Sequence, residues 1–261
     1  MMFKKVLLLS SVVAFTMFAI SNLVFAEEAY NPEINPADFT TEITNPYLTL
    51  PVGKVLVYEG ETEDGLERIE ITITDEKKIV MGVETIVYWD RAWIDGELVE
   101  DTKDWLAQDK DGNVWYFGED VNNYVRGKLH DHDGAWEAGI DGALPGIWVI
   151  GNPQVGGTYR QEYYAGEAED MVDVVAVNQT VTTRLGTFTG CLKTYDYFPL
   201  DPESREHKYY CPEVGGVVLI ENLEDDERVE LIDVDTTDDE DAKDENDEND
   251  ENDENDENDE N

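Results

Sequence analysis

Apolar and polar residues alternate with a period of two along most of this chain after Gly53. Ile69, Ile71 and Ile73, for example, are separated by single polar residues. Such alternation is typical of a strand with one buried and one solvated face. The strand-like run 83–93 is followed by Asp-Gly at 95–96, a dipeptide that tolerates positive φ and favours a two-residue hairpin loop. The pattern therefore predicts antiparallel strands joined by short turns.

The same pattern recurs toward the C-terminus, with no long amphipathic helix between the runs. The further predicted strands are 98–109, 113–124, 158–177, 181–198, 208–222 and 228–234. Residues 127–157 lose the alternation, and we expect the longest irregular region there. The predicted fold class is all-β, a single antiparallel meander that forms an open barrel or half-barrel; a two-sheet sandwich is the alternative.

The two ends of the chain differ from this middle part. Lys4 and Lys5 precede the apolar run 6–20, and Val24 and Ala26 occupy the −3 and −1 positions of a signal-peptidase site. Residues 1–26 are therefore predicted to be a cleaved secretory signal peptide, with an N-terminal membrane anchor as the alternative. No cysteine lies near Ala26, so a lipobox is absent. We expect a secreted, periplasmic or extracellular protein with no membrane span after cleavage.

The remaining boundaries follow from composition. Residues 27–52 are rich in Asn-Pro pairs and predict an extended lead-in, and residues 53–235 predict the β domain. Residues 236–261 end in six copies of Asp-Glu-Asn at 244–261, a repeat without apolar residues, and this segment is expected to be a disordered acidic tail.

The chain carries 62 Asp and Glu against 18 Lys and Arg, a formal net charge of −44. This charge repels nucleic acid and anionic lipid, so we expect neither as a partner. It attracts divalent cations or a basic partner protein. Adaptation to high salt explains the same acidity without any ligand, and the sequence leaves both explanations open.

Cys191 and Cys211 are the two cysteines, and in an exported protein such a pair predicts a disulfide. The turn-rich stretch 199–204 lies between them, and a hairpin there would place them nearly opposite each other.

Three stretches carry a resemblance: Asp104 to Glu119, Trp136 to Gly146, and Tyr159 to Tyr163 with Gly166-Glu-Ala-Glu-Asp170. Together they resemble a family of uncharacterised secreted bacterial proteins and lipoproteins, over residues 38–222. The resemblance implies an open β-barrel of the kind that lipoprotein carriers use, and it implies no activity. The chain departs from the family at 210–215, where it reads Tyr-Cys-Pro-Glu-Val-Gly instead of Tyr-Ala-Pro-Gly-Val-Gly, so Cys211 is a local addition.

A turn at Asp111-Gly112 predicts which residues of the neighbouring strands face each other. The predicted pairs are Lys110 with Asn113, Gln108 with Trp115, Leu106 with Phe117 and Asp104 with Glu119. Opposed like charges are destabilising and need an offset: a cation, a nearby arginine (Arg126 or Arg160), or a raised pKa. Calcium prefers several oxygen ligands, and the predicted calcium ligands are Asp101, Asp104, Glu119 and Asp120. A solvated pair at the sheet edge is the alternative.

Two further groups of residues are candidates for binding. His130, His132 and Asp133 are candidates for a second metal site that binds zinc or copper, and an exposed polar loop is the favoured alternative. The predicted ligand-binding loop residues are Trp136, Glu137, Asp141, Arg160 and Glu162. Charged residues on the solvent face of an ordinary strand are the alternative for Arg160 and Glu162.

Motifs for catalysis are absent from the sequence: it contains no Gly-x-Ser-x-Gly, no His-Glu-x-x-His and no P-loop. The sequence leaves enzymatic activity uncertain and favours its absence. The leading hypothesis is a secreted non-enzymatic binding protein that holds calcium at the 101–120 hairpin. The alternatives are an open barrel that binds a hydrophobic or amphipathic small ligand, and an interaction protein that acts through its acidic tail.

Overall fold

The computed structural model describes residues 30–236. The chain divides into two compact units, residues 1–31 and 32–261, and the second contains every strand described. The predicted signal peptide and most of the predicted tail lie outside the described residues. Within them, regular structure is almost entirely antiparallel strand, apart from one short 3-10 turn, η1, at Pro36–Asp38.

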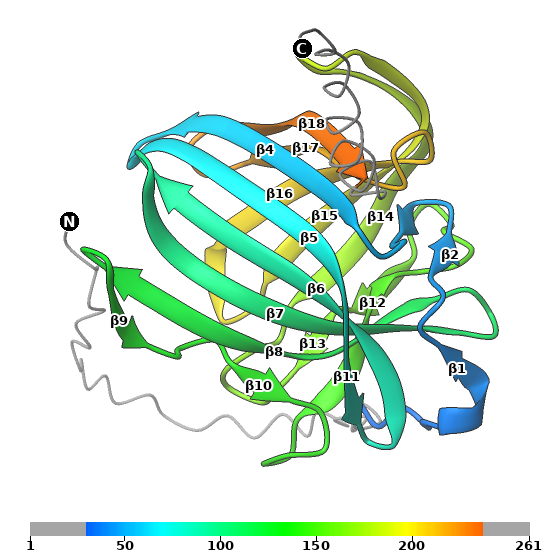
Figure 1. Cartoon of the computed structure of the whole chain (residues 1–261). Helices are drawn as coiled ribbons and strands as arrows, with labels where there is room; N and C mark the ends of the chain where they lie inside the picture. The colour runs from blue at the N-terminus through cyan, green and yellow to red at the C-terminus, as the bar shows by residue number, and fades with distance from the viewer. Residues whose placement is uncertain (1–29, 237–261) are drawn as a thin grey trace, which may run out of the picture. The chain divides into compact units, whose positions relative to one another are not determined.

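The strands of the main sheet follow one another as a meander (Figure 1). Its long members are β4 (Lys54–Thr62), β5 (Gly65–Val80), β6 (Val83–Ile94), β7 (Glu97–Asp109), β8 (Val114–Val125), β14 (Met171–Thr182), β15 (Thr187–Phe198), β16 (Asp201–Cys211), β17 (Gly216–Asn222) and β18 (Arg228–Thr236). The shorter members are β1 (Phe39–Thr40), β9 (Lys128–Asp131), β10 (Trp136–Glu137), β11 (Leu144–Val149), β12 (Thr158–Arg160) and β13 (Glu162–Tyr163), while β2 (Thr44–Asn45) and β3 (Leu48–Thr49) pair separately.

The segment 158–163, which contains β12 and β13, nearly closes this sheet into a barrel. The strand order is β12-β14-β15-β16-β17-β18-β4-β5-β6-β7-β8-β11-β13, so β12 and β13 stand at opposite ends. These two strands are consecutive in the chain: Tyr159 pairs with Val172 of β14, and Glu162 pairs with Pro145 of β11. The prediction of an all-β antiparallel barrel is therefore confirmed, and the two-sheet sandwich is not adopted.

The Asp95-Gly96 turn forms as predicted. Strand β6 ends at Ile94 and β7 begins at Glu97, with φ of 50° at Asp95 and 81° at Gly96. Two successive positive φ values are what a type I′ turn requires, and its twist matches that of the flanking strands.

Residues 127–157 are more regular than the sequence indicated. They contain β9, β10 and β11, and β11 pairs with β8 on one side and with β13 on the other. The alternation is hidden there because the run Leu144-Pro-Gly-Ile-Trp-Val149 includes Pro145 and Gly146. Gly146 is needed because a side chain at this position would collide with the backbone of Gln161.

The β7–β8 hairpin differs from the prediction near its turn. The Asp109 carboxylate accepts hydrogen bonds from the backbone N–H groups of Asp111 and Asn113, so the loop spans residues 110–113. Gln108 then pairs with Val114 and Leu106 with Tyr116, one residue away from the predicted partners. A β-bulge at Phe117 and Gly118 compensates for this shift, and Asp104 faces Glu119 as predicted.

The interior of the barrel changes character from one end of the strands to the other. Along the inward faces, apolar residues such as Leu56, Ile73, Leu106, Leu192 and Tyr210 are at most 2% exposed. Farther along the strands, the inward-facing positions are occupied by acidic residues such as Asp90, Asp104 and Glu119. The apolar end holds the core, and the acidic end holds the candidate site.

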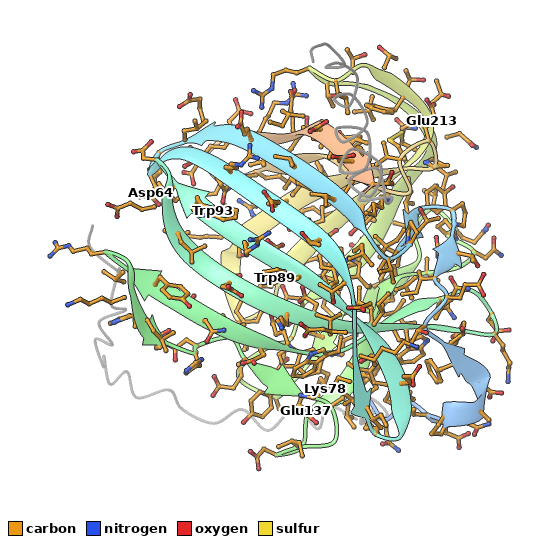
Figure 2. All side chains as sticks on the ribbon, viewed as in Figure 1. Asp64, Lys78, Trp89, Trp93, Glu137 and Glu213 are labelled. Atoms are coloured by element: carbon orange, nitrogen blue, oxygen red, sulfur yellow. A yellow bond between two sulfur atoms is a disulfide. The ribbon has the colours of Figure 1, made fainter. Side chains whose placement is uncertain are left out.

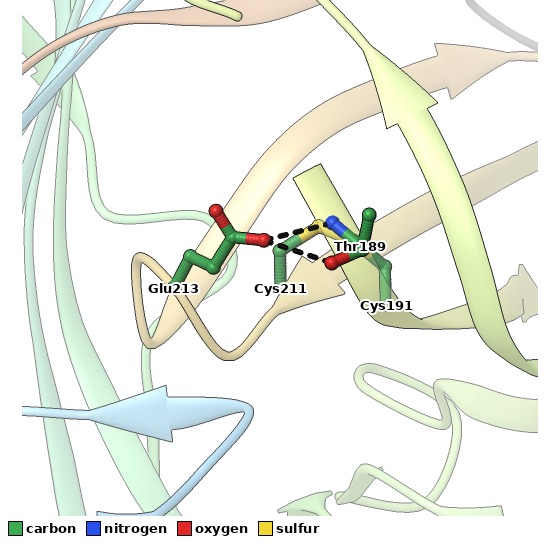
Figure 3. Close-up of a disulfide and its surroundings, with 4 residues drawn as sticks. All are labelled: Thr189, Cys191, Cys211 and Glu213. Carbon is green, nitrogen blue, oxygen red and sulfur yellow. Dashed lines mark hydrogen bonds between the residues drawn. A yellow bond between two sulfur atoms is a disulfide. The ribbon is translucent and has the colours of Figure 1, made fainter. Parts of the chain in front are cut away.

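The predicted disulfide forms between β15 and β16. The Cα atoms of Cys191 and Cys211 are 4.3 Å apart, and both residues are fully buried (Figure 3). Glu213 lies beside the bridge and accepts hydrogen bonds from the backbone N–H and the hydroxyl of Thr189, at 2.9 and 3.1 Å. The hairpin therefore places the two cysteines opposite each other as predicted.

Candidate functional site: an acidic barrel interior

Five carboxylates share the barrel interior: Asp90 (β6), Asp104 (β7), Glu119 (β8), Glu162 (β13) and Asp170, the residue just before β14. Strand register fixes the direction of the first three. Asp90 pairs with inward-facing Ile71, Asp104 pairs with buried Tyr88, and Glu119 pairs with Asp104. Directly paired residues lie on the same face of a sheet, so all three point inward.

Burial raises the pKa of these carboxyls, and their negative neighbours add to the effect. The pKa of Asp90 rises to about 7, mainly through burial and then through the charges of Glu100 and Glu67. The pKa of Glu119 rises to about 7, again mainly through burial. Loss of hydration disfavours the charged form of an acid, and like charges nearby do the same.

The other three acids follow the same rule. Burial, followed by the charge of Glu119, raises the pKa of Asp104 well above its usual range. Burial, followed by the charge of Asp170, does the same for Glu162. Burial raises the pKa of Asp170 to about 6, against the opposing effect of Lys208. Asp104 is 4% exposed, whereas the other four keep partial contact with solvent.

None of these five carboxylates forms an ion pair with a basic residue in the described part of the chain. The basic side chain that faces them is Lys208 of β16, whose Nζ lies 2.8 Å from Glu206 Oε1 and 3.3 Å from Asp196 Oδ2. Burial acts to lower the pKa of Lys208, but Glu206 and Asp196 outweigh it and raise this pKa well above its usual range. Lys208 is therefore an ammonium ion held between two acids.

Aromatic side chains adjoin the acids. The Tyr116 hydroxyl donates a hydrogen bond to Asp104 Oδ1. The Tyr116 ring lies 4.7 Å from Trp148 and 5.3 Å from Trp136, between ring centroids, and Trp148 lies 5.4 Å from Tyr88. These four residues form the aromatic cluster of the interior.

Gly118 brings Trp136 to the site. Strand β10 pairs with β8 so that Trp136 faces Glu119, and a side chain at position 118 would collide with the Trp136 backbone. Gly118 also has a φ of 124°, which other residues rarely adopt. Trp136 is 5% exposed, and its indole N–H forms no hydrogen bond of ordinary geometry with the described residues. This N–H is directed toward Glu119, and its interaction with the Glu119 carboxylate acts to lower the pKa of Glu119.

The structure does not bring the four predicted calcium ligands together. Asp104 and Glu119 point inward, whereas Asp101 and Asp120 lie on the opposite face of the same strands. Asp101 Oδ1 accepts a hydrogen bond of 2.9 Å from Trp89 Nε1 on the outer face (Figure 2), and Asp120 pairs in register with Lys103. The side-chain period of two separates neighbours such as 119 and 120. Within residues 30–236, no three His, Cys, Asp or Glu side chains are grouped as metal ligands.

The predicted histidine site is an exposed edge strand and loop. His130 Nε2 lies 3.5 Å from Asp131, and His132 Nδ1 lies 2.7 Å from the carbonyl of Val121. His130, His132 and Asp133 are all exposed, and the two histidines contact different groups. The structure therefore shows no convergence of these three side chains.

The predicted ligand-loop residues separate into two groups. Trp136 and Glu162 reach the interior, as described above. Glu137 pairs with Lys78 at 2.8 Å, where both are seen side by side in Figure 2, and Asp141 is exposed. Arg160 lies 3.9 Å from Glu169 and 4.9 Å from the centre of the Tyr163 ring.

Sequence reasoning missed five of the eight charged interior residues named above. The missed interior residues are Asp90, Asp170, Asp196, Glu206 and Lys208. A signal was present: in β14, β15 and β16, the inward series Val174-Val172-Asp170, Leu192-Thr194-Asp196 and Tyr210-Lys208-Glu206 change from apolar to charged in the same direction across the sheet. Detecting it requires the register of these three successive strands, which includes irregularities in the pairing of β14 with β15 and of β15 with β16.

A surface cavity of 280 Å³ adjoins this acidic end, since Glu206 lines it as well as contacting Lys208. Its other lining residues are Asp201, Glu203, Ser204, Arg205, Asn222 and Glu224. Four of the seven lining side chains are acidic, so acidic residues continue from the interior to the surface at this point.

No family model matches the chain, and no curated protein is significantly similar to it. Among solved structures, the chain resembles one described as a "putative lipoprotein" from Parabacteroides distasonis ATCC 8503, with a TM-score of 0.39 and 14% identity over 72% of this chain and 98% of that chain. A likeness at this level carries no conclusion about function. Among residues 30–236, no helix has the length and apolar character needed to cross a membrane.

Proposed function

We propose that this chain is an exported, non-enzymatic binding protein whose barrel interior binds a cation. The supporting observation is the set of five interior carboxylates, Asp90, Asp104, Glu119, Glu162 and Asp170, without a basic partner among the described side chains. Each ionised carboxylate has lost hydration in the interior, and a cation would restore favourable interactions. The raised pKa values of these carboxyls reflect burial that no neighbouring positive charge fully offsets.

Export is supported by the signal-peptide pattern at residues 1–26 and by the buried disulfide, since structural disulfides persist in oxidising compartments. This proposal keeps Asp104 and Glu119 from the original calcium hypothesis. It replaces Asp101 and Asp120 with the inward-facing Asp90, Glu162 and Asp170. An interaction through the acidic tail is a separate property, expected to weaken steeply with added salt.

The proposal is tested by calorimetric titration of the purified protein with calcium chloride, magnesium chloride and phenethylamine hydrochloride at pH 8. Two double variants provide the comparison. D104N/E119Q removes two inward charges from β7 and β8, and D101N/D120N removes two outward charges from the same strands. All three proteins keep the tail, so weak binding of ions to it is common to them.

We expect at least one of the three cations to bind the wild type and D101N/D120N equally. We expect the same cation to bind D104N/E119Q more weakly, on the order of 10- to 100-fold, because charge-assisted contacts are lost. Equal affinity in all three proteins, or no binding to any of them, would refute the interior site.

A further inference from the structure

The barrel interior already holds one ammonium group, and its surroundings define the chemistry that the site accepts. Lys208 Nζ lies between Glu206 and Asp196, at 2.8 and 3.3 Å. Its side chain is 20% exposed, so the ammonium has exchanged most of its water for carboxylate oxygens. This interior therefore stabilises a primary ammonium ion.

Asp196 shows that the acids in this region are not saturated. It is 5% exposed; its Oδ2 lies 3.3 Å from Lys208 Nζ, whereas its Oδ1 has no hydrogen-bond partner among the described residues. It faces the interior from β15, since it pairs with Glu206 and since Lys208 acts on its pKa. A buried acceptor without a donor is costly, so the site favours a ligand that brings N–H groups.

The aromatic cluster supplies a second kind of contact next to the acids. Tyr116 touches both environments, because its hydroxyl donates to Asp104 while its ring packs against Trp136 and Trp148. Aromatic faces attract organic cations and also pack against apolar groups. A ligand with an ammonium head and an apolar body would match the acids and the rings together.

The arrangement of the acids also suits such a ligand. Asp90, Asp104 and Glu119 lie on the neighbouring strands β6, β7 and β8, whereas Asp170 lies just before β14 and Asp196 lies on β15, and Figure 1 shows β14 and β15 on the facing side of the barrel. Inward-facing acids on three neighbouring strands can each accept from one of the three N–H donors of an ammonium.

We infer that the cation bound in the barrel interior is an organic primary ammonium ion with an apolar body. The inference rests on the proposed function and specifies its ligand class. The ammonium lies among Asp104, Glu119 and Asp90, and the apolar body packs against the cluster of Tyr88, Tyr116, Trp136 and Trp148.

Phenethylamine is the probe, and 2-phenylethanol is its neutral counterpart with the same apolar body. Calorimetry and thermal melting at pH 8 are measured for both compounds and for calcium chloride, on wild type, D104N/E119Q and D101N/D120N. Indole fluorescence is recorded as well, because a ligand against the cluster changes the surroundings of Trp136 and Trp148.

We expect phenethylamine to raise the melting temperature of wild type and D101N/D120N and to change their fluorescence. We expect at least a 10-fold loss of affinity in D104N/E119Q, and no saturable binding of 2-phenylethanol to any protein. D104N/E119Q is expected to fold, because it removes a like-charge pair.

Three outcomes overturn the inference, and the first two differ in what they say about the proposed function. If calcium binds in a manner that depends on Asp104 and Glu119 while phenethylamine does not bind, the ligand class is wrong and the cation site stands. If neither binds in that manner, both proposals fail. Equal binding of the amine and the alcohol would show an apolar site without charge recognition, which also contradicts the inference.

Discussion

Lys54 of β4 is 4% exposed, and its ammonium donates hydrogen bonds to the carbonyls of Thr49, Val214 and Gly215 at 2.9, 2.8 and 2.8 Å. Burial lowers its pKa to about 8, so it remains protonated at pH 7. The side chain thereby ties β4 to the β16–β17 turn. We expect K54M to lower the free energy of unfolding by about 3 kcal/mol, because three carbonyls lose a charged donor.

Urea denaturation at pH 7 measures this effect. Lys77 provides the control: it is 48% exposed and pairs with Glu84 at 2.7 Å, so K77M is expected to cost less than about 1 kcal/mol. A K54M protein as stable as K77M would show that the three hydrogen bonds contribute no more than a surface ion pair.

At the level of elements, the bulge in β8 connects the fold to the site. Gly118 has a φ of 124° and lies against the backbone of Trp136 and Glu137. We expect G118A to separate β10 from β8 and to shift Trp136 away from Glu119. Its expected effects are a loss of about 2 kcal/mol in stability and a red shift of indole fluorescence. G96A is the control for positive φ, because nothing lies within 4 Å of a side chain there; fluorescence unchanged from wild type in G118A would contradict this role.

The disulfide joins β15 and β16 at the end of the strands that holds the apolar core. Its loss in C191A/C211A is expected to reduce the free energy of unfolding by about 3 kcal/mol, since the bridge closes a loop with a sequence separation of 20. Lys208 and Asp196 lie farther along the same strands, so cation affinity should change little. Denaturation with and without reductant measures the stability. Reductant should destabilise wild type and leave the variant unaffected, and an equal response would contradict the prediction.

The sequence predicted individual strands and turns better than it predicted how the strands pair and which side chains share a face. Ile69, Ile71 and Ile73 indicated strand β5, and Asp95-Gly96 indicated the turn between β6 and β7, because period and turn chemistry are local. The Asp104–Glu119 pair was predicted correctly, although the assumed turn was wrong, because the bulge at Gly118 restored the register. Asp101 and Asp120 were grouped with that pair by proximity in sequence, whereas the pleat places them on the other face. Asp170 and Asp196 come from a distant part of the chain, and only closure of the barrel places them in the same interior as Asp104.

For the whole molecule, the interior acids determine how stability depends on pH. Asp90, Glu119 and Asp170 have pKa values of about 7, 7 and 6 in the folded protein, against ordinary values of 3.8 to 4.5. Between about pH 4 and pH 7 the folded chain therefore binds more protons than the unfolded chain, and its stability falls as pH rises through this window. A shift of two units in one group corresponds to roughly 3 kcal/mol.

The net charge of −44 also favours stability at lower pH, through weaker repulsion, so the interior contribution needs a matched comparison. Thermal and urea unfolding from pH 4.5 to 7.5 would be measured for wild type, D90N/E119Q and D101N/D120N. Both variants lose two negative charges, but only the first loses groups that take up protons on folding. We expect D90N/E119Q to show a clearly shallower fall in stability, and D101N/D120N to follow the wild type. The same protons compete with a bound cation, so affinity in the wild type should rise over the window in which stability falls. Parallel slopes in all three proteins would mean that overall charge, and not the interior, controls the response to pH.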